Sequence, residues 1–170
     1  LNIRENVTCH YNAAIPLGDD IELIATTLWA HIPLQDAFRT EAVISDFRRI
    51  RYGVEPLDFN RFNDEHYRCF KFLRESVSSS KAKHIIVATH HVPSFELMSP
   101  EFKGSDLNGA FTVELGDYIA ASPIEYWIYG HSHRNIDKVI GNTQCISNQL
   151  GYVFSNEHSS FDRTKHIEIV

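Results

Sequence analysis

The hydrophobic positions of this chain are grouped into short apolar runs that are separated by polar and turn-forming segments. Three runs are rich in β-branched and aromatic residues, which favours buried strands: Ile21–Leu28, His84–Thr89 and Glu125–Tyr129. Shorter β-like pieces follow towards the C-terminus: Lys138–Ile140, Gln144–Ser147, Tyr152–Phe154 and Ile167–Val170. The pattern therefore predicts a sheet whose later strands are short.

Helical spacing is clearest over Asn63–Ser79. Its apolar side recurs every three or four residues, at Phe62, His66, Phe70, Leu73 and Val77, and Asn63 is a suitable capping residue. Parts of Gln35–Ile50 and Thr112–Ala121 also favour helix. The segment Ser94–Ala110 between these elements shows no period, and loops of that length in a compact domain are often functional.

The order of strand, helix and strand predicts an α/β fold, because alternating elements stack as a sheet with helices on its faces. The chain shows no internal repeat, low-complexity tract or domain boundary. We therefore expect a single domain over residues 1–170.

Composition narrows the classes of partner. The 170 residues are 43% hydrophobic and carry a formal net charge of −6, which excludes the broad basic surface that nucleic-acid binding needs. No apolar run approaches the roughly 20 residues that span a bilayer, so we expect no membrane partner. The three cysteines, Cys9, Cys69 and Cys145, are odd in number and far apart, which predicts buried thiols in a reducing, cytoplasmic setting.

Two histidine clusters carry the candidate chemistry. Thr89-His90-His91 and Gly130-His131-Ser132-His133 each follow a predicted buried strand, and ligands bind where strands leave an open α/β sheet. Neutral imidazole is a common metal ligand. Either cluster alone is explained as well by packed or solvated rings, but the repeated placement after a strand favours a metal site. Gly130 and Ser132 permit a tight turn that brings both rings of the second cluster over the strand end.

The same segments resemble a known family. Val87–Pro93 looks like the THHxP segment of calcineurin-like metallophosphoesterases, and Tyr129–His133 looks like their GHxH segment. The resemblance runs in the family's order from about Ile21 to Tyr152. Thr27-Leu28-Trp29 and Ser147–Tyr152 are similar to segments of small bacterial members.

This resemblance implies the C-terminal portion of a four-layer αββα sandwich. It implies that His90 and His131 bind one metal, that His133 binds the other, and that His91 is a catalytic residue beside them, touching a substrate oxygen. The metals would be two divalent or trivalent ions of manganese, iron or zinc, which activate a bridging water for attack on phosphorus. Phosphomonoesters or phosphodiesters, on small molecules or phosphoproteins, are the implied substrates.

The family's D-x-H, G-D-x-x-D and G-N-H-[DE] motifs have no working counterpart in the chain. Asp64-Glu65-His66 has the residue types of the D-x-H motif, but it is expected to begin a helix. Gly18-Asp19-Asp20 is expected to form a turn. Asn156-Glu157-His158 follows the GHxH segment, which is the wrong order.

The missing motifs lead us to expect an N-terminally truncated domain that lacks about 80 residues, if each βαβ unit takes about 30 or more. Such a fragment would hold one metal or none and be inactive, and would expose a surface able to form a homo-oligomer. The alternative is a non-catalytic metal-binding or protein-interaction module on the same fold. A structural zinc domain is disfavoured because neither cluster contains cysteine.

Overall fold

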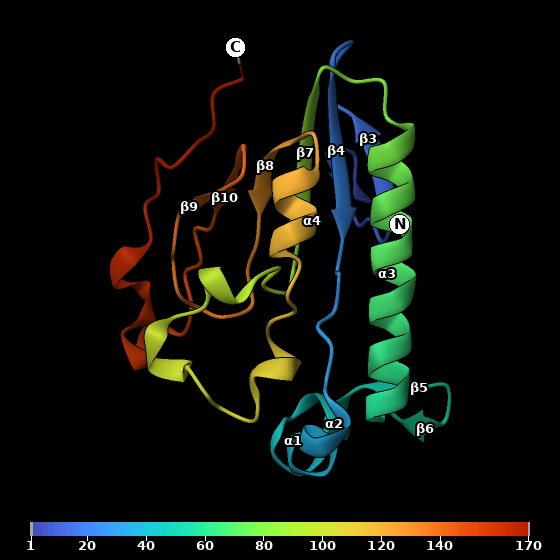
Figure 1. Cartoon of the computed structure of the whole chain (residues 1–170), viewed down its shortest axis with the longest axis vertical. Coiled ribbons are helices and arrows are strands. Elements are labelled where there is room, and N and C mark those ends of the chain that lie inside the picture. The colour runs from blue at the N-terminus through green and yellow to red at the C-terminus, as the bar shows by residue number, and fades with distance from the viewer. Residues whose placement is uncertain (1, 170) are drawn as a thin grey trace.

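A computed structural model describes residues 2–169, which are organised around a six-stranded mixed sheet (Figure 1). In spatial order its strands are β3 (Ala13–Pro16), β4 (Ile21–Thr26), β7 (His84–Thr89), β8 (Ile124–Ile128), β10 (Thr143–Ile146) and β9 (Lys138–Ile140). The four central strands are parallel, and β3 and β9 are antiparallel strands at the two edges. The predicted α/β class is therefore correct.

The helices are α1 (Ala37–Val43), α2 (Asp46–Arg49), α3 (Phe59–Ser79) and α4 (Gly116–Ala121). Helix α3 buries the predicted stripe, with Phe62, His66 and Leu73 inside. The predicted cap at Asn63 is wrong: Asp58 caps α3 by accepting the Arg61 N–H at 2.8 Å. The side chain of Asn63 instead bonds both backbone groups of Ile32.

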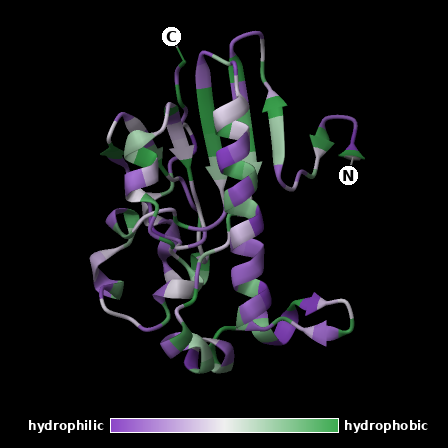
Figure 2. Ribbon diagram, turned by 45° about the vertical axis from the view of Figure 1, so that its right-hand side comes forward, coloured by the Kyte–Doolittle hydropathy of each residue, from purple (hydrophilic) through white to green (hydrophobic). Residues whose placement is uncertain are grey.

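Two small hairpins and several 3₁₀ turns complete the described chain. The hairpins pair β1 (Asn2–Arg4) with β2 (Val7–Thr8), and β5 (Arg51–Tyr52) with β6 (Glu55–Pro56). The 3₁₀ turns are η1 (Leu34–Asp36), η2 (Phe95–Leu97), η3 (Pro100–Phe102), η4 (Asn108–Ala110), η5 (Val153–Ser155) and η6 (Glu157–Ser160). Figure 2 shows the N-terminal hairpin projecting beyond β3 at the side of the molecule.

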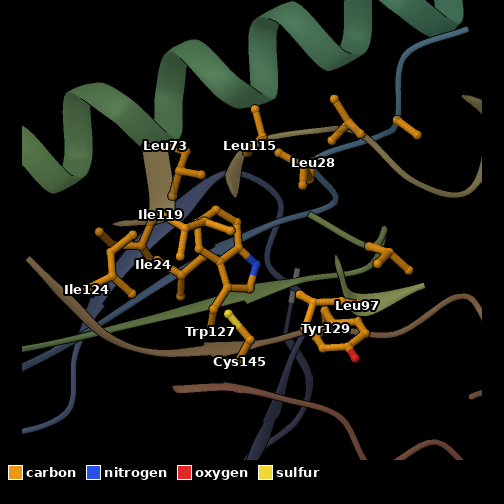
Figure 3. Packing of buried hydrophobic residues seen from close by; sticks show 14 of the residues in the cluster. Ile24, Leu28, Leu73, Leu97, Leu115, Ile119, Ile124, Trp127, Tyr129 and Cys145 are labelled. Carbon is orange, nitrogen blue, oxygen red and sulfur yellow. The ribbon is translucent and has the colours of Figure 1, made fainter. Parts of the chain in front are cut away.

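The core lies between the sheet and helices α3 and α4, which lie on the same face of the sheet (Figure 1). Trp127 of β8 is fully buried among side chains from β4, β10 and both helices (Figure 3). Its Nε1–H donates to Thr89 Oγ1 at 3.0 Å. Because this bond joins the middle of β8 to the last residue of β7, core packing fixes the strand end that carries the first histidine cluster.

The opposite face of the sheet is less well covered. Ala25, Ala88, Ile128 and Ile146 are register partners across four parallel strands, and all four are only half-buried. The C-terminal segment lies over part of this face, where the Tyr126 hydroxyl donates to the Glu168 carbonyl at 3.0 Å. The described residues thus form a sheet with helices on one face and a partly exposed apolar row on the other.

Some predicted elements are wrong. Tyr152–Phe154 is not a strand, since the chain forms the 3₁₀ turn η5 there. Residues 167–169 form no strand, and Val170 lies outside the described residues. The predicted helix Thr112–Ala121 is shorter and begins at Gly116. Cys69 and Cys145 are buried free thiols as predicted, but Cys9 is exposed rather than buried.

None of the helices in the described part of the chain combines the length and apolar character that crossing a membrane requires.

Candidate functional site

The two histidine clusters meet at one edge of the sheet. Strands β7 and β8 are parallel neighbours, so the segments that follow them leave the sheet on the same side. The Gly130 N–H donates to the His90 carbonyl at 3.1 Å and ties the two segments together. A Cβ on residue 130 would lie 3.4 Å from that oxygen, an ordinary contact distance, so this approach does not require glycine.

A tight turn places the histidines of the second cluster. The Ser132 N–H bonds the Gly130 carbonyl at 2.9 Å, and His131 and His133 have φ angles of 70° and 53°. Left-handed backbone is uncommon for residues other than glycine and is often found where a site constrains the chain. The turn predicted from Gly130 and Ser132 is present.

His131 joins His90 and His91. The His131 ring centroid lies 4.5 Å from that of His90 and 4.4 Å from that of His91. The centroids of His90 and His91 are 5.1 Å apart. From here on, "the histidine cluster" means these three residues, whereas "the second cluster" still means the sequence segment Gly130-His131-Ser132-His133. Rings at these distances are close enough for two of them to reach a common small ion at ligand distances of about 2 Å.

The environment keeps the histidine cluster neutral. Desolvation by burial, followed by repulsion from His90, lowers the pKa of His131 to about 4, although a bond to the Ala110 backbone opposes the change. Desolvation also lowers the pKa of the more exposed His90, partly offset by the charge of Asp46. A neutral ring has a free lone pair, and metal ligation requires that form of imidazole.

His91 is the buried member of the histidine cluster. Its side chain is 2% exposed and stacks on Trp29, with a centroid distance of 5.7 Å. Nδ1 lies 3.3 Å from the Thr27 carbonyl, and desolvation lowers the pKa of the ring well below its ordinary value. Nε2 is buried and has no hydrogen-bond partner among the described residues, which is unusual for a buried polar atom.

His133 packs against the C-terminal segment, and its charge acts on both His90 and His131. Its ring packs edge-on against Tyr152 at 4.6 Å, and its Nδ1 lies 2.8 Å from Glu157 Oε2. The carboxylate accepts from Nδ1–H, so in the neutral ring the lone pair is on Nε2. Carboxylates often orient metal-ligating histidines in this manner.

Gln149 holds the turn of the second cluster. Its Oε1 accepts the His133 N–H at 2.8 Å, and its Nε2 donates to the Arg134 carbonyl at 2.8 Å and to Ser132 Oγ at 3.2 Å. Gln149 belongs to the segment Ser147–Tyr152 that resembles part of the family, so a sequence signal for it existed. Its role as a support for the turn was not predicted.

Glu157 contacts a predicted site residue, although the sequence analysis did not include it in the site. Asn156-Glu157-His158 was compared with G-N-H-[DE] and dismissed for its position after the GHxH segment. It does not supply that motif, but Glu157 bonds His133 from the last part of the chain. Asp64-Glu65-His66, the other segment that matches a family motif by sequence only, lies inside α3. His66 is buried there, and its Nδ1 faces the Leu28 and Trp29 carbonyls at 3.2 Å.

The donors fit part of a metal centre. Imidazoles from both strand ends come together, and the buried Nε2 of His91 has no partner among the described residues. Within residues 2–169, however, no three side chains of histidine, cysteine, aspartate or glutamate are placed to hold one ion. The predicted ligands His90, His131 and His133 therefore supply an incomplete set.

Comparisons with known proteins assign no family to the chain. No family model matches the chain. It is similar to the uncharacterized protein L509 of Acanthamoeba polyphaga mimivirus, with 28% identity over 165 residues that cover 89% of this chain and 56% of the relative. The chain thus spans little more than half the length of that relative.

Proposed function

We propose that this chain is the C-terminal portion of a metal-dependent phosphoesterase that hydrolyses phosphomonoesters or phosphodiesters. One observation carries the proposal: the rings of His90 and His131, which follow different strands, lie 4.5 Å apart at the edge of the sheet. This convergence supports the resemblance of Thr89-His90-His91 and Gly130-His131-Ser132-His133 to the metal motifs of calcineurin-like metallophosphoesterases.

The remaining donors would come from outside this chain. The mimivirus relative is longer, with only 56% of its length matched, so a related whole protein has room for the carboxylate motifs. Their strands would form the other layers of the proposed αββα sandwich. The half-buried row at Ala25, Ala88, Ile128 and Ile146 is the apolar face on which a second sheet would pack.

The residues of this chain have separate tasks in the proposed reaction. His90 and His131 offer neutral nitrogens to one metal, and His133, oriented by Glu157, offers Nε2 to the other. Manganese, iron or zinc ions, when bound, would supply positive charge for the phosphoryl oxygens and lower the pKa of water. His91 is the residue that we assign to a substrate oxygen: its Nδ1–H faces the Thr27 carbonyl, so the unpartnered Nε2 of the neutral ring would accept from a protonated oxygen of the substrate.

A non-catalytic module on the same fold is the second candidate. It is favoured by the absence of a complete ligand set within residues 2–169. Such a protein would keep the histidine cluster as a packed structural feature or as a weak metal site without turnover.

Assays of p-nitrophenyl phosphate and bis-p-nitrophenyl phosphate with added Mn²⁺ separate the two candidates. The whole protein should hydrolyse at least one of the esters, and a chelator should abolish the activity. His131→Ala should reduce kcat by orders of magnitude, whereas the exposed His10→Ala should not. Absence of metal-dependent hydrolysis by the folded whole protein would favour the non-catalytic module.

A further inference from the structure

A pocket of about 220 Å³ lies between the long loop and the turn of the second cluster. Most of its surface is apolar, and its walls include Met98, Phe102 and Leu107 from the loop and Phe111 directly after it. Ser132, which separates His131 from His133, also lines it. We call this space the loop pocket.

The loop pocket adjoins the histidine cluster at Phe111 and Ser132. The ring of Phe111 forms one of its walls and also stacks on His131, with a centroid distance of 4.8 Å. The pocket and the histidine cluster therefore lie side by side, with the Phe111 ring touching both.

The walls of the loop pocket are held in place. The guanidinium of Arg134 lies over the Phe102 ring, 5.8 Å from its centroid, and Arg134 Nε bonds Glu101 at 2.8 Å. Asn108 Nδ2 donates to the Phe102 carbonyl at 2.9 Å and closes the loop behind that ring. These contacts anchor the exposed Phe102 at the entrance.

The size of the loop pocket suits one part of a ligand. Whole small-molecule sites usually measure about 300–1,000 Å³, whereas an apolar cavity of about 150 Å³ holds benzene. Phe102 and Phe111 offer ring faces and edges, and Met98 offers a thioether, which contacts aromatic rings favourably. These walls favour an aromatic ring over a sugar or a charged group.

We infer that the loop pocket binds the aromatic organic group of a phosphate ester whose phosphate lies at the histidine cluster. This inference rests on the proposed phosphoesterase function and names its substrate class. A phosphate ester of a single substituted aromatic ring matches both the volume and the walls.

The first arm of the test detects an aromatic ring in the loop pocket without any phosphate. Met98 is the one methionine of the sequence, so a ¹³C-methyl methionine label reports on the loop pocket. A Met98→Leu variant assigns its signal. Benzyl alcohol should shift this signal in a saturable way, because a bound ring changes the local magnetic field, whereas tert-butanol should not.

Matched variants locate that effect. Leu107→Trp fills the loop pocket, and Leu34→Trp makes the same change at a side chain that is 76% exposed and lies outside it. Leu107→Trp should abolish the shift caused by benzyl alcohol, and Leu34→Trp should retain it. Circular dichroism of both variants shows whether they are folded.

The second arm measures phenyl phosphate and methyl phosphate hydrolysis by the whole protein. Leu107→Trp should lower the ratio of kcat/KM for the two esters by about tenfold, and Leu34→Trp should leave it unchanged. Comparing the same two esters across variants cancels the difference between their leaving groups.

The two arms give distinct outcomes. A Met98 signal that does not respond to benzyl alcohol, or an unchanged ratio in folded Leu107→Trp, overturns the inference while leaving the proposed function standing. A specific Met98 response without hydrolysis of either ester contradicts the proposed function, and with it the assignment of a phosphate ester to the loop pocket.

Discussion

The carboxylate of Glu157 accepts a hydrogen bond from His133, with 2.8 Å between Oε2 and Nδ1. The same oxygen accepts the Tyr152 N–H at 2.6 Å, and this bond contributes most to lowering the pKa of Glu157, followed by its interaction with His133. An ionised carboxylate therefore fixes the tautomer of His133 and leaves Nε2 free. The last segment of the chain, far from the strand ends in sequence, thereby shapes the candidate metal centre.

Glu157→Gln tests this relationship. Glutamine can keep the bond through its Oε1, but the neutral amide holds the ring less firmly and no longer makes Nε2 more basic, so metal affinity should fall by about 10- to 100-fold. Isothermal titration of Mn²⁺ into the whole protein measures the change. Glu101→Gln is the matched control, because Glu101 pairs with Arg134 at the surface and does not touch His133. Equal affinities of the two variants would show that Glu157 does not orient a ligand.

Gly151→Ala should disturb the same contact from the backbone. Gly151 has a φ of +62°, and an added Cβ would lie 2.6 Å from Glu157 Cβ and 3.3 Å from His133 Cβ. Gly53 has a similar φ of +68° but open space around it, so Gly53→Ala carries the conformational cost alone. We expect Gly53→Ala to lower the unfolding free energy by about 1 kcal/mol, and Gly151→Ala by about 1–3 kcal/mol more. Urea denaturation of both variants measures this difference, and similar losses would contradict the packing around Glu157.

The pH dependence of stability follows from the buried imidazoles. The pKa of His131 falls from 6.5 to about 4 on folding, and that of His91 is also lowered. Between those values the unfolded chain binds protons that the folded chain does not, so the unfolding free energy should decrease as pH falls from about 6.5 to about 4. The His131 contribution is at most about 3 kcal/mol.

Denaturation in the presence of a chelator isolates this effect from metal binding. His131→Asn should make the loss of stability between about pH 7 and about pH 4.5 smaller, and His10→Asn should leave it unchanged. A His131→Asn profile parallel to that of the unsubstituted chain would show that His131 is not buried in its neutral form.

Sequence reasoning succeeded where side-chain pattern and burial coincide. His84–Thr89 is a strand with the predicted bounds because its apolar run is buried in the core and lies between two other strands. The apolar stripe of α3 was correct for the same reason. The approach of His90 to His131 also followed from local information, because each histidine comes directly after one of two parallel strands.

The errors occurred where long-range contacts determine the structure. The Asn63 side chain was predicted to cap a helix, but it bonds Ile32, a partner that no local pattern reveals. Tyr152–Phe154 has strand-like composition, yet Tyr152 packs on His133 and the chain turns there. Glu157 was missed because its role depends on the C-terminal segment folding back to the sheet.

The open sheet face predicts association of the isolated 170-residue chain. The row at Ala25, Ala88, Ile128 and Ile146 is half-buried, and exposed apolar patches on soluble proteins usually mark interfaces. We expect light scattering to show a dimer or larger species, and Ile128→Lys to shift it towards monomer. Val54→Lys, at a side chain that is 90% exposed on the β5–β6 hairpin, is the control. A monomer at all concentrations would contradict this prediction.

The central claim is that the histidine cluster belongs to the metal centre of a phosphoesterase, and metal content measured together with turnover tests it most directly. Metal bound per chain should be determined by mass spectrometry of the whole protein, alongside kcat for p-nitrophenyl phosphate, for His131→Ala and His10→Ala. Loss of metal together with a fall in kcat by orders of magnitude in His131→Ala alone is the predicted result. A His131→Ala protein with its full metal content and normal turnover would contradict the account.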